Sequence, residues 1–138
     1  LEQLLALEVR RPLERILVAR AARRSNAAQR KAFEELADRL EEQAASGNAA
    51  HYLLVDREYD ELIDQCAGNV YATDALHPIH GLVRRFWATM NDTPEWKKVA
   101  KLHIGVVRAV ATGNPEKAER ASTALMDFNE EIIRARTE

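Results

Sequence analysis

The sequence predicts an all-α fold, an antiparallel bundle of about six helices in a single domain. Three observations support this prediction. The composition is aliphatic and rich in Ala and Glu, with few residues that favour strands. No Asn-Gly hairpin or alternating strand pattern occurs. Helix start and stop signals, in contrast, recur along all 138 residues, a length that can bury a core without disulfide or metal.

The first predicted helix runs from the start of the chain to near Ser25 and contains Pro12. Asn26, with Gln29 three residues later, resembles a capping box and begins the second helix. Gly47 ends that helix. A proline inside a helix removes one backbone hydrogen bond and should bend it, which leaves room for a cavity.

The third helix is predicted to begin after Asn48 and to end at Gly68. Asn69 then begins the fourth, which Pro78 interrupts. The fifth starts at Thr93–Glu95, which combines a cap, a first-turn proline and an acid, and ends at Gly113. Asn114–Glu116 repeats this start for the sixth helix. Because the connections are short, we expect consecutive helices to pack antiparallel.

The overall charge and the cysteine content exclude several classes of protein. The net charge of −2 gives no electrostatic footprint for DNA or anionic lipid. The single cysteine, Cys66, falls on an apolar stripe and fits an inert core thiol in a reducing cytoplasm. No apolar run reaches the length of a membrane span, and no signal peptide is present. We therefore expect a cytoplasmic domain without membrane contact.

Two carboxylates of the third predicted helix are candidates for a site. Asp56 and Asp60 lie one turn apart on its half-buried side, between Leu53 and Ile63. Neighbouring carboxylates repel each other, so an arginine, another cation or a shared proton is needed nearby. They could equally be boundary residues that meet solvent or an arginine from another helix.

The fifth predicted helix places a histidine near the centre of its apolar stripe. Val99, Val106, Val107 and Val110 surround His103 at helical spacing. A lone core histidine is more often a satisfied structural residue than a ligand. A facing aspartate pair would favour a metal site instead, since imidazole and carboxylates suit Zn²⁺, Mn²⁺ or Ni²⁺.

The first predicted helix contributes a guanidinium to the interior. Arg10 projects with Leu13 and Leu17, whereas Arg11 points the other way. A guanidinium inside a bundle must meet an anion. That anion is either a protein carboxylate, for which Glu14 lies one turn away, or the carboxylate of a ligand.

The fourth predicted helix adds a histidine and an arginine. His80 and Arg84 lie at the edge of its apolar stripe, where they are either a boundary pair or part of a site. His51 and His77 fit surface or turn positions.

Six short segments, spread over nearly the whole chain, follow the order of the motifs of a known family. They are Glu8–Glu14, Glu35–Leu40, Ala44–Asn48, Asp56–Asp60, Ala67–Asn69 and Leu76–Trp87. Together they resemble the FCD (FadR C-terminal) domain of the GntR family of bacterial transcription regulators. Each motif alone is weakly specific, so the resemblance rests on all six occurring in order.

The resemblance implies a single effector-binding and dimerisation domain over residues 1–138, with a small carboxylate effector in an internal pocket. It implies a homodimeric repressor or activator that contacts DNA only through an N-terminal winged helix-turn-helix domain, which we expect upstream of Leu1. Effector binding would shift the placement of the two DNA-binding heads. Arg10, and with it Arg84 and His80, would bind the effector.

The resemblance also implies a possible metal site, because many family members hold a metal with one Asp and three His. By position, Asp56 and His103 match two ligands, Asp60 replaces one histidine, and Leu125 stands where the third falls. Asp56, Asp60 and His103 could hold Zn²⁺, Ni²⁺ or Mn²⁺ at a reduced site, or the pocket is metal-free, as in the acyl-CoA-responsive branch. Because Leu125 makes one corner apolar, we favour no tightly bound metal.

Two other functions stay open. In a helical scaffold or protein-interaction domain, Arg10 and His103 would be satisfied core residues in a solidly packed interior. A metal-dependent enzyme would need an open metal site and a general base, for which Asp60 is the obvious candidate. No Glu-x-x-His motif of a di-iron bundle occurs, and we expect no enzyme.

Overall fold

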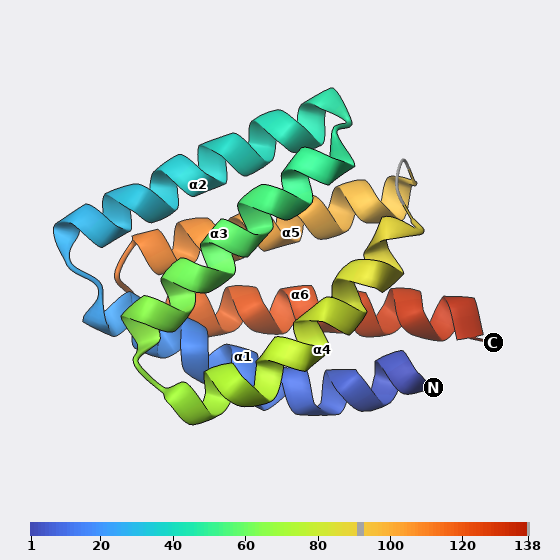
Figure 1. The fold of residues 1–138 in the computed structure, drawn as a ribbon, viewed down its shortest axis with the longest axis horizontal. Helices are drawn as coiled ribbons and strands as arrows, with labels where there is room; N and C mark the ends of the chain where they lie inside the picture. The colour runs from blue at the N-terminus through green and yellow to red at the C-terminus, as the bar shows by residue number, and fades with distance from the viewer. Residues whose placement is uncertain (91–92, 138) are drawn as a thin grey trace.

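The computed structural model describes residues 1–90 and 93–137, and this part of the chain contains six helices and no strand (Figure 1). The helices are α1 (Glu2–Arg24), α2 (Ala27–Ser46), α3 (Ala49–Ala67), α4 (Val70–Ala88), α5 (Pro94–Ala111) and α6 (Pro115–Thr137). The predicted all-α bundle is confirmed.

The helix starts follow the predicted side-chain caps. The side chain of Asn26 accepts a bond from the Gln29 amide at 2.8 Å, and the Gln29 side chain accepts one from the Asn26 amide at 2.9 Å. Asn48, Asn69 and Thr93 cap α3, α4 and α5 in the same manner. Each cap satisfies a backbone N–H group that has no partner within the helix.

The helix ends depend on glycine where the backbone turns left-handed. Gly47 and Gly68 end α2 and α3 with φ of 72° and 63°, a region that other residues rarely adopt. Pro12 and Pro78 lie inside α1 and α4, and both helices continue through them.

The helices do not pack in chain order. α1 lies beside α6, with the N- and C-terminal ends on the same side of the molecule, and α1 also packs on α3 (Figure 1). α2 packs between α3 and α5, and α5 packs on α6, so five helices close a ring of pairwise contacts. α4 lies across α1 and touches α3 less extensively (Figure 1).

This arrangement corrects part of the predicted topology. α2 and α3 run in opposite directions and pack together, as do α5 and α6, but α1 packs mainly on α6 and α3 instead of on α2. The Ser25–Asn26 connection fixes only the distance between two helix ends. The apolar faces decide which helices pack along their lengths.

One side of the interior is a dry apolar core centred on α2. Phe33 and Leu40 of α2, and Val107 and Val110 of α5, have no exposed surface. Cys66 is a buried free thiol, so the expected core cysteine is confirmed. Among the described residues, no helix is long and apolar enough to cross a membrane.

Candidate functional site

A cavity of about 100 Å³ lies inside the bundle, lined by five helices but by no residue of α2. All six side chains that the sequence singled out lie at its wall, namely Arg10, Asp56, Asp60, His80, Arg84 and His103. Apolar residues, including Val83, Trp87, Trp96 and Leu125, complete the wall. His51 and His77 are exposed on the surface, as expected.

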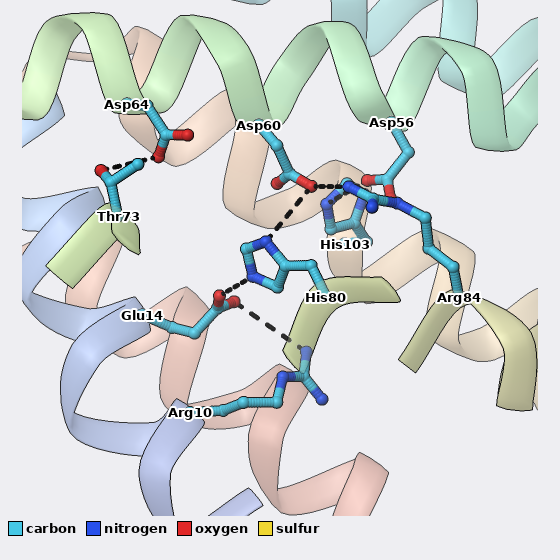
Figure 2. A network of polar contacts seen from close by, with 9 residues as sticks. All are labelled: Arg10, Glu14, Asp56, Asp60, Asp64, Thr73, His80, Arg84 and His103. Atoms are coloured by element: carbon cyan, nitrogen blue, oxygen red, sulfur yellow. Dashed lines mark hydrogen bonds and ion pairs between the residues drawn. The ribbon is translucent and has the colours of Figure 1, made fainter. Parts of the chain in front are cut away.

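Asp56 and Asp60 meet an arginine from α4. Arg84 Nη2 donates to Asp60 Oδ2 at 2.5 Å, and its Nε lies 3.9 Å from Asp56 Oδ2 (Figure 2). The side chains of all three are about four-fifths buried. Arg84 therefore supplies the positive charge that the aspartate pair needs.

His80 links α4 to α1 and α3. Its Nε2 donates to Glu14 Oε1 at 2.5 Å, and its Nδ1 lies 3.6 Å from Asp60 Oδ2 (Figure 2). Burial favours the neutral imidazole, but Glu14 and Asp60 outweigh it and raise the pKa of His80 to about 9. Burial likewise works to raise the pKa of Glu14, but His80, with Arg10, lowers it to about 2. At neutral pH the two form an ion pair.

Asp60 is the carboxyl group whose charge the cavity disfavours. Burial and the neighbouring Asp56 raise the pKa of Asp60 above its ordinary range, although His80 and Arg84 act in the opposite direction. With Asp60 ionised, three carboxylates face Arg10, Arg84 and His80. With Asp60 protonated, positive charge is in excess, which favours an incoming anion.

His103 is held by protein groups from α3. Its Nε2 lies 3.1 Å from Asp56 Oδ1, and the Tyr52 hydroxyl lies 3.3 Å from its Nδ1. The Tyr59 ring packs edge-on against the imidazole, with the ring centroids 5.0 Å apart. The structure thus gives His103 the partners of a satisfied structural residue while it still faces the cavity.

Three buried side-chain atoms at the cavity have no hydrogen-bond partner among the described residues, and they belong to Arg10, Arg84 and Asn129. The Arg84 guanidinium bonds Asp60 through Nη2, but its Nε is unsatisfied. Arg10 is 7% exposed and lies 3.9 Å from Glu14 in an ion pair. Its Nε has no hydrogen-bond partner among the described residues. Asn129 of α6 is 2% exposed, and its Oδ1 has no partner. Buried polar atoms are rarely left unsatisfied in native proteins, so these atoms mark places for a ligand or ordered water.

The predicted metal ligands lie at one cavity, but their arrangement does not fit a resident transition metal. Arg84 contacts both Asp56 and Asp60, and the His103 Nε2 faces Asp56. Within residues 1–90 and 93–137, no group of three or more His, Cys, Asp or Glu side chains could hold a metal ion. The role of Asp56, Asp60 and His103 as metal ligands therefore stays a prediction.

Sequence reasoning missed the role of three residues that line the cavity, namely Glu14, Tyr52 and Asn129. It treated Glu14 only as the neighbour of Arg10, although its shortest bond is to His80. Tyr52 and Asn129 were not considered. Asn129 carried a usable signal, because it follows Leu125 by one turn on the apolar stripe of α6. The Glu14–His80 pair carried none, since it depends on how α4 crosses α1.

A family model described as the FCD domain matches residues 5–128, which is nearly the whole chain. No curated protein matches.

Proposed function

The chain belongs to the FCD domain family, and from this premise we propose that it senses a small carboxylate effector on behalf of a GntR-family transcription regulator. FCD domains are generally effector-binding domains of such regulators, and their role is regulatory, not catalytic. The effector would bind in the cavity enclosed by α1, α3, α4, α5 and α6.

This proposal rests on Arg10, whose guanidinium is buried but incompletely paired. Its guanidinium is buried beside a cavity, yet the nearest carboxylate, Glu14, is bonded to His80 and reaches Arg10 only at 3.9 Å. A guanidinium presents five N–H donors in a planar fork that matches a carboxylate. Arg10 therefore keeps donors for the carboxylate of a ligand, and the site excludes much of the water that would weaken this bond.

The other charged residues prepare the cavity for that anion. Arg84 balances one charge of the aspartate pair, and burial raises the pKa of Asp60 and so favours its neutral form. His80 neutralises Glu14, so an incoming carboxylate meets little repulsion. Pockets for drug-sized ligands measure roughly 300–1,000 Å³, whereas this cavity measures about 100 Å³. The effector in this closed arrangement is therefore a small acid. Arg84 and His80 stay secondary candidates for contact with it.

The same contacts suggest how binding is transmitted. His80 ties α4 to Glu14 of α1, and Glu14 also faces Arg10. A ligand carboxylate at Arg10 would compete with Glu14 and shift the balance between two placements of α4 on α1. In a cytoplasmic homodimer with winged helix-turn-helix domains upstream, that shift would change the spacing of the two DNA-binding heads.

An exposed apolar stripe on α1 supports the proposed dimer. Leu5, Val9 and Ile16 lie on one face of the helix and are 54%, 42% and 41% exposed. Contiguous apolar surface of this kind commonly marks a protein interface. The cavity lined by Arg10, Asp56 and His103 counts against a scaffold with a solidly packed core.

A thermal-shift screen of small carboxylic acids, followed by calorimetry of each hit, tests the proposal. Arg10→Ala should weaken binding of the stabilising acid by tenfold or more, because a charged hydrogen bond is worth about 1.5–3 kcal/mol. Helicity should change little. Arg11→Ala is the matched control, since Arg11 bonds Asp127 and Glu130 on the outer surface. If binding survived Arg10→Ala undiminished, the proposed anchor would be wrong.

A further inference from the structure

Asn129 is a buried polar residue to which the charged network assigns no role. It lies on α6, is 2% exposed, and lines the same cavity as Arg10. Its Oδ1 has no hydrogen-bond partner among the described residues. A buried amide without a partner is destabilising, so a site that keeps one needs a separate explanation.

Arg10 lies level with Asn129 across the α1–α6 interface. The contacts of Arg11, the next residue along α1, show this. Arg11 donates to the Met126 carbonyl at 3.4 Å and to Glu130 at 3.2 Å. Met126 and Glu130 flank Asn129 along α6. Since Arg10 and Asn129 line one cavity of about 100 Å³ at this level, a single small molecule can contact both.

The unpaired atoms of Arg10 and Asn129 are chemically different. Arg10 Nε offers a hydrogen-bond donor with positive charge, whereas Asn129 Oδ1 offers an acceptor. A plain carboxylate satisfies the first group only, because it carries no hydrogen to donate. A hydroxyl or amino group next to the carboxylate supplies the missing donor.

We infer that Asn129 determines effector specificity by accepting a hydrogen bond from a hydroxyl or amino group adjacent to the carboxylate that Arg10 binds. This inference rests on the proposed function and names the chemical class of its effector, a small acid with a hydrogen-bond donor near the carboxylate. Acids of the same size without that donor would leave Oδ1 buried and unpaired, and they would bind more weakly for this reason.

The test uses matched acids of two to four carbons, each as the plain acid, the 2-hydroxy acid and the 2-amino acid. Propanoate, lactate and alanine form one such set. Calorimetry should show that the wild-type protein prefers one donor-bearing member by about 10- to 100-fold. Asn129→Leu, which has similar size and no hydrogen-bonding group, should remove this preference while binding of the plain acid persists.

Two further variants separate specificity from structural damage. Asn129→Ala removes the same acceptor without adding apolar bulk, and it should also abolish the preference. Leu125→Ala, one turn away on the same wall, should change the affinities for all three acids alike and keep the preference.

Each failure has a distinct meaning. Equal binding of plain and donor-bearing acids, or an unchanged preference in both Asn129 variants, would overturn the inference and leave the proposed function standing. Failure of every acid to bind the wild-type protein would overturn both.

Discussion

The interior of the bundle has two unlike halves. Around α2, Phe33 and Leu40 pack against α5 without exposed surface, and no residue of α2 reaches the cavity. On the side covered by α4, the interior instead holds two arginines, two histidines and three carboxylates around a cavity. Both halves belong to one bundle of six helices within the described residues.

The two halves differ in what they contribute: the half around α2 stabilises the fold, and the polar half is the proposed binding site. Burial of apolar side chains is the dominant favourable term in folding, and the α2 half supplies it at high packing density. The polar half stabilises less, since each buried charge loses hydration that its partner only partly returns. A chain that needed only a stable bundle would gain by filling the polar half with apolar side chains. The polar half, with partners missing at Arg10 and Asn129, is what the proposed binding function requires.

The largest effect on stability should come from a substitution in the apolar half around α2. Phe33→Ala removes a fully buried ring that packs edge-on against Tyr59. We expect a loss of about 3–5 kcal/mol in the free energy of unfolding, because a large cavity is left behind. Urea denaturation measures this loss. The affinity of the folded Phe33→Ala protein for the small carboxylic acid, measured at low temperature, should be unchanged. A loss below about 1 kcal/mol would contradict the assignment of this half as the stabilising core.

The polar half should give stability an unusual pH dependence. Glu14 has its pKa lowered from 4.5 to about 2, so its contribution is present above pH 4.5 and is lost as the pH falls towards 2. His80 has its pKa raised from 6.5 to about 9, so its contribution is present below pH 6.5 and is lost as the pH rises through 9. Asp60, with its raised pKa, also weakens the fold as the pH rises.

Stability should therefore fall on the alkaline side between pH 6.5 and 9, by on the order of 1–2 kcal/mol. Urea denaturation across this range measures the fall. Glu14→Gln is the matched variant: it keeps the size of the side chain, removes the charge beside His80 and should flatten the alkaline fall. Proton NMR of the His80 ring in this variant should show its pKa well below 9. An equally steep fall in both proteins would show that the Glu14–His80 pair is not its cause.

The smallest effect should be on metal binding. It tests whether the carboxylates of the polar half pair with cations of the protein or coordinate a metal ion. Leu125→His restores an imidazole at the cavity wall and should raise Zn²⁺ or Ni²⁺ affinity by about tenfold, or 1.4 kcal/mol. Adding Arg84→Ala should raise it further, because Asp56 and Asp60 would lose the guanidinium between them. Arg85→Ala, at the exposed neighbouring position, is the control.

Elemental mass spectrometry and calorimetry measure this series. We expect little metal in the wild-type protein. Stoichiometric metal that is lost on Asp56→Ala or His103→Ala would show that the reduced site still coordinates an ion. Unchanged affinity in Leu125→His would show that the positional transfer of the family's ligands to α6 is wrong.

Local signals in the sequence were sufficient for most of the fold. Caps such as Asn26 and stops such as Gly47 act within a few residues, so they can be read without knowing the tertiary structure. The pairing of α1 with α6 could not be read in this way. It depends on which apolar faces meet after the whole chain has collapsed.

The same distinction explains the site. Arg10, Asp56 and His103 could be found because each is an ionisable residue on an apolar helical face, a property of one helix. Glu14 could be named as the neighbour of Arg10, but the bonds of Arg84 to Asp60 and of His80 to Glu14 could not be predicted, because they form only where α4 crosses α3 and α1. The pattern of each helix therefore identified residues that line the cavity, but not which residues of different helices pair with each other.

In the proposed function, Arg10 binds the carboxylate of the effector inside the polar half. Nitrogen-15 NMR of the arginine Nε–H groups observes this contact, with Arg10→Ala and Arg11→Ala used to assign the signals. Titration with the acid that stabilises the protein most should shift the Arg10 Nε–H signal and slow its exchange with solvent, because an unpaired donor gains a charged partner. The Arg11 signal should stay in place. Saturable binding of the acid with the Arg10 signal unmoved would contradict the account.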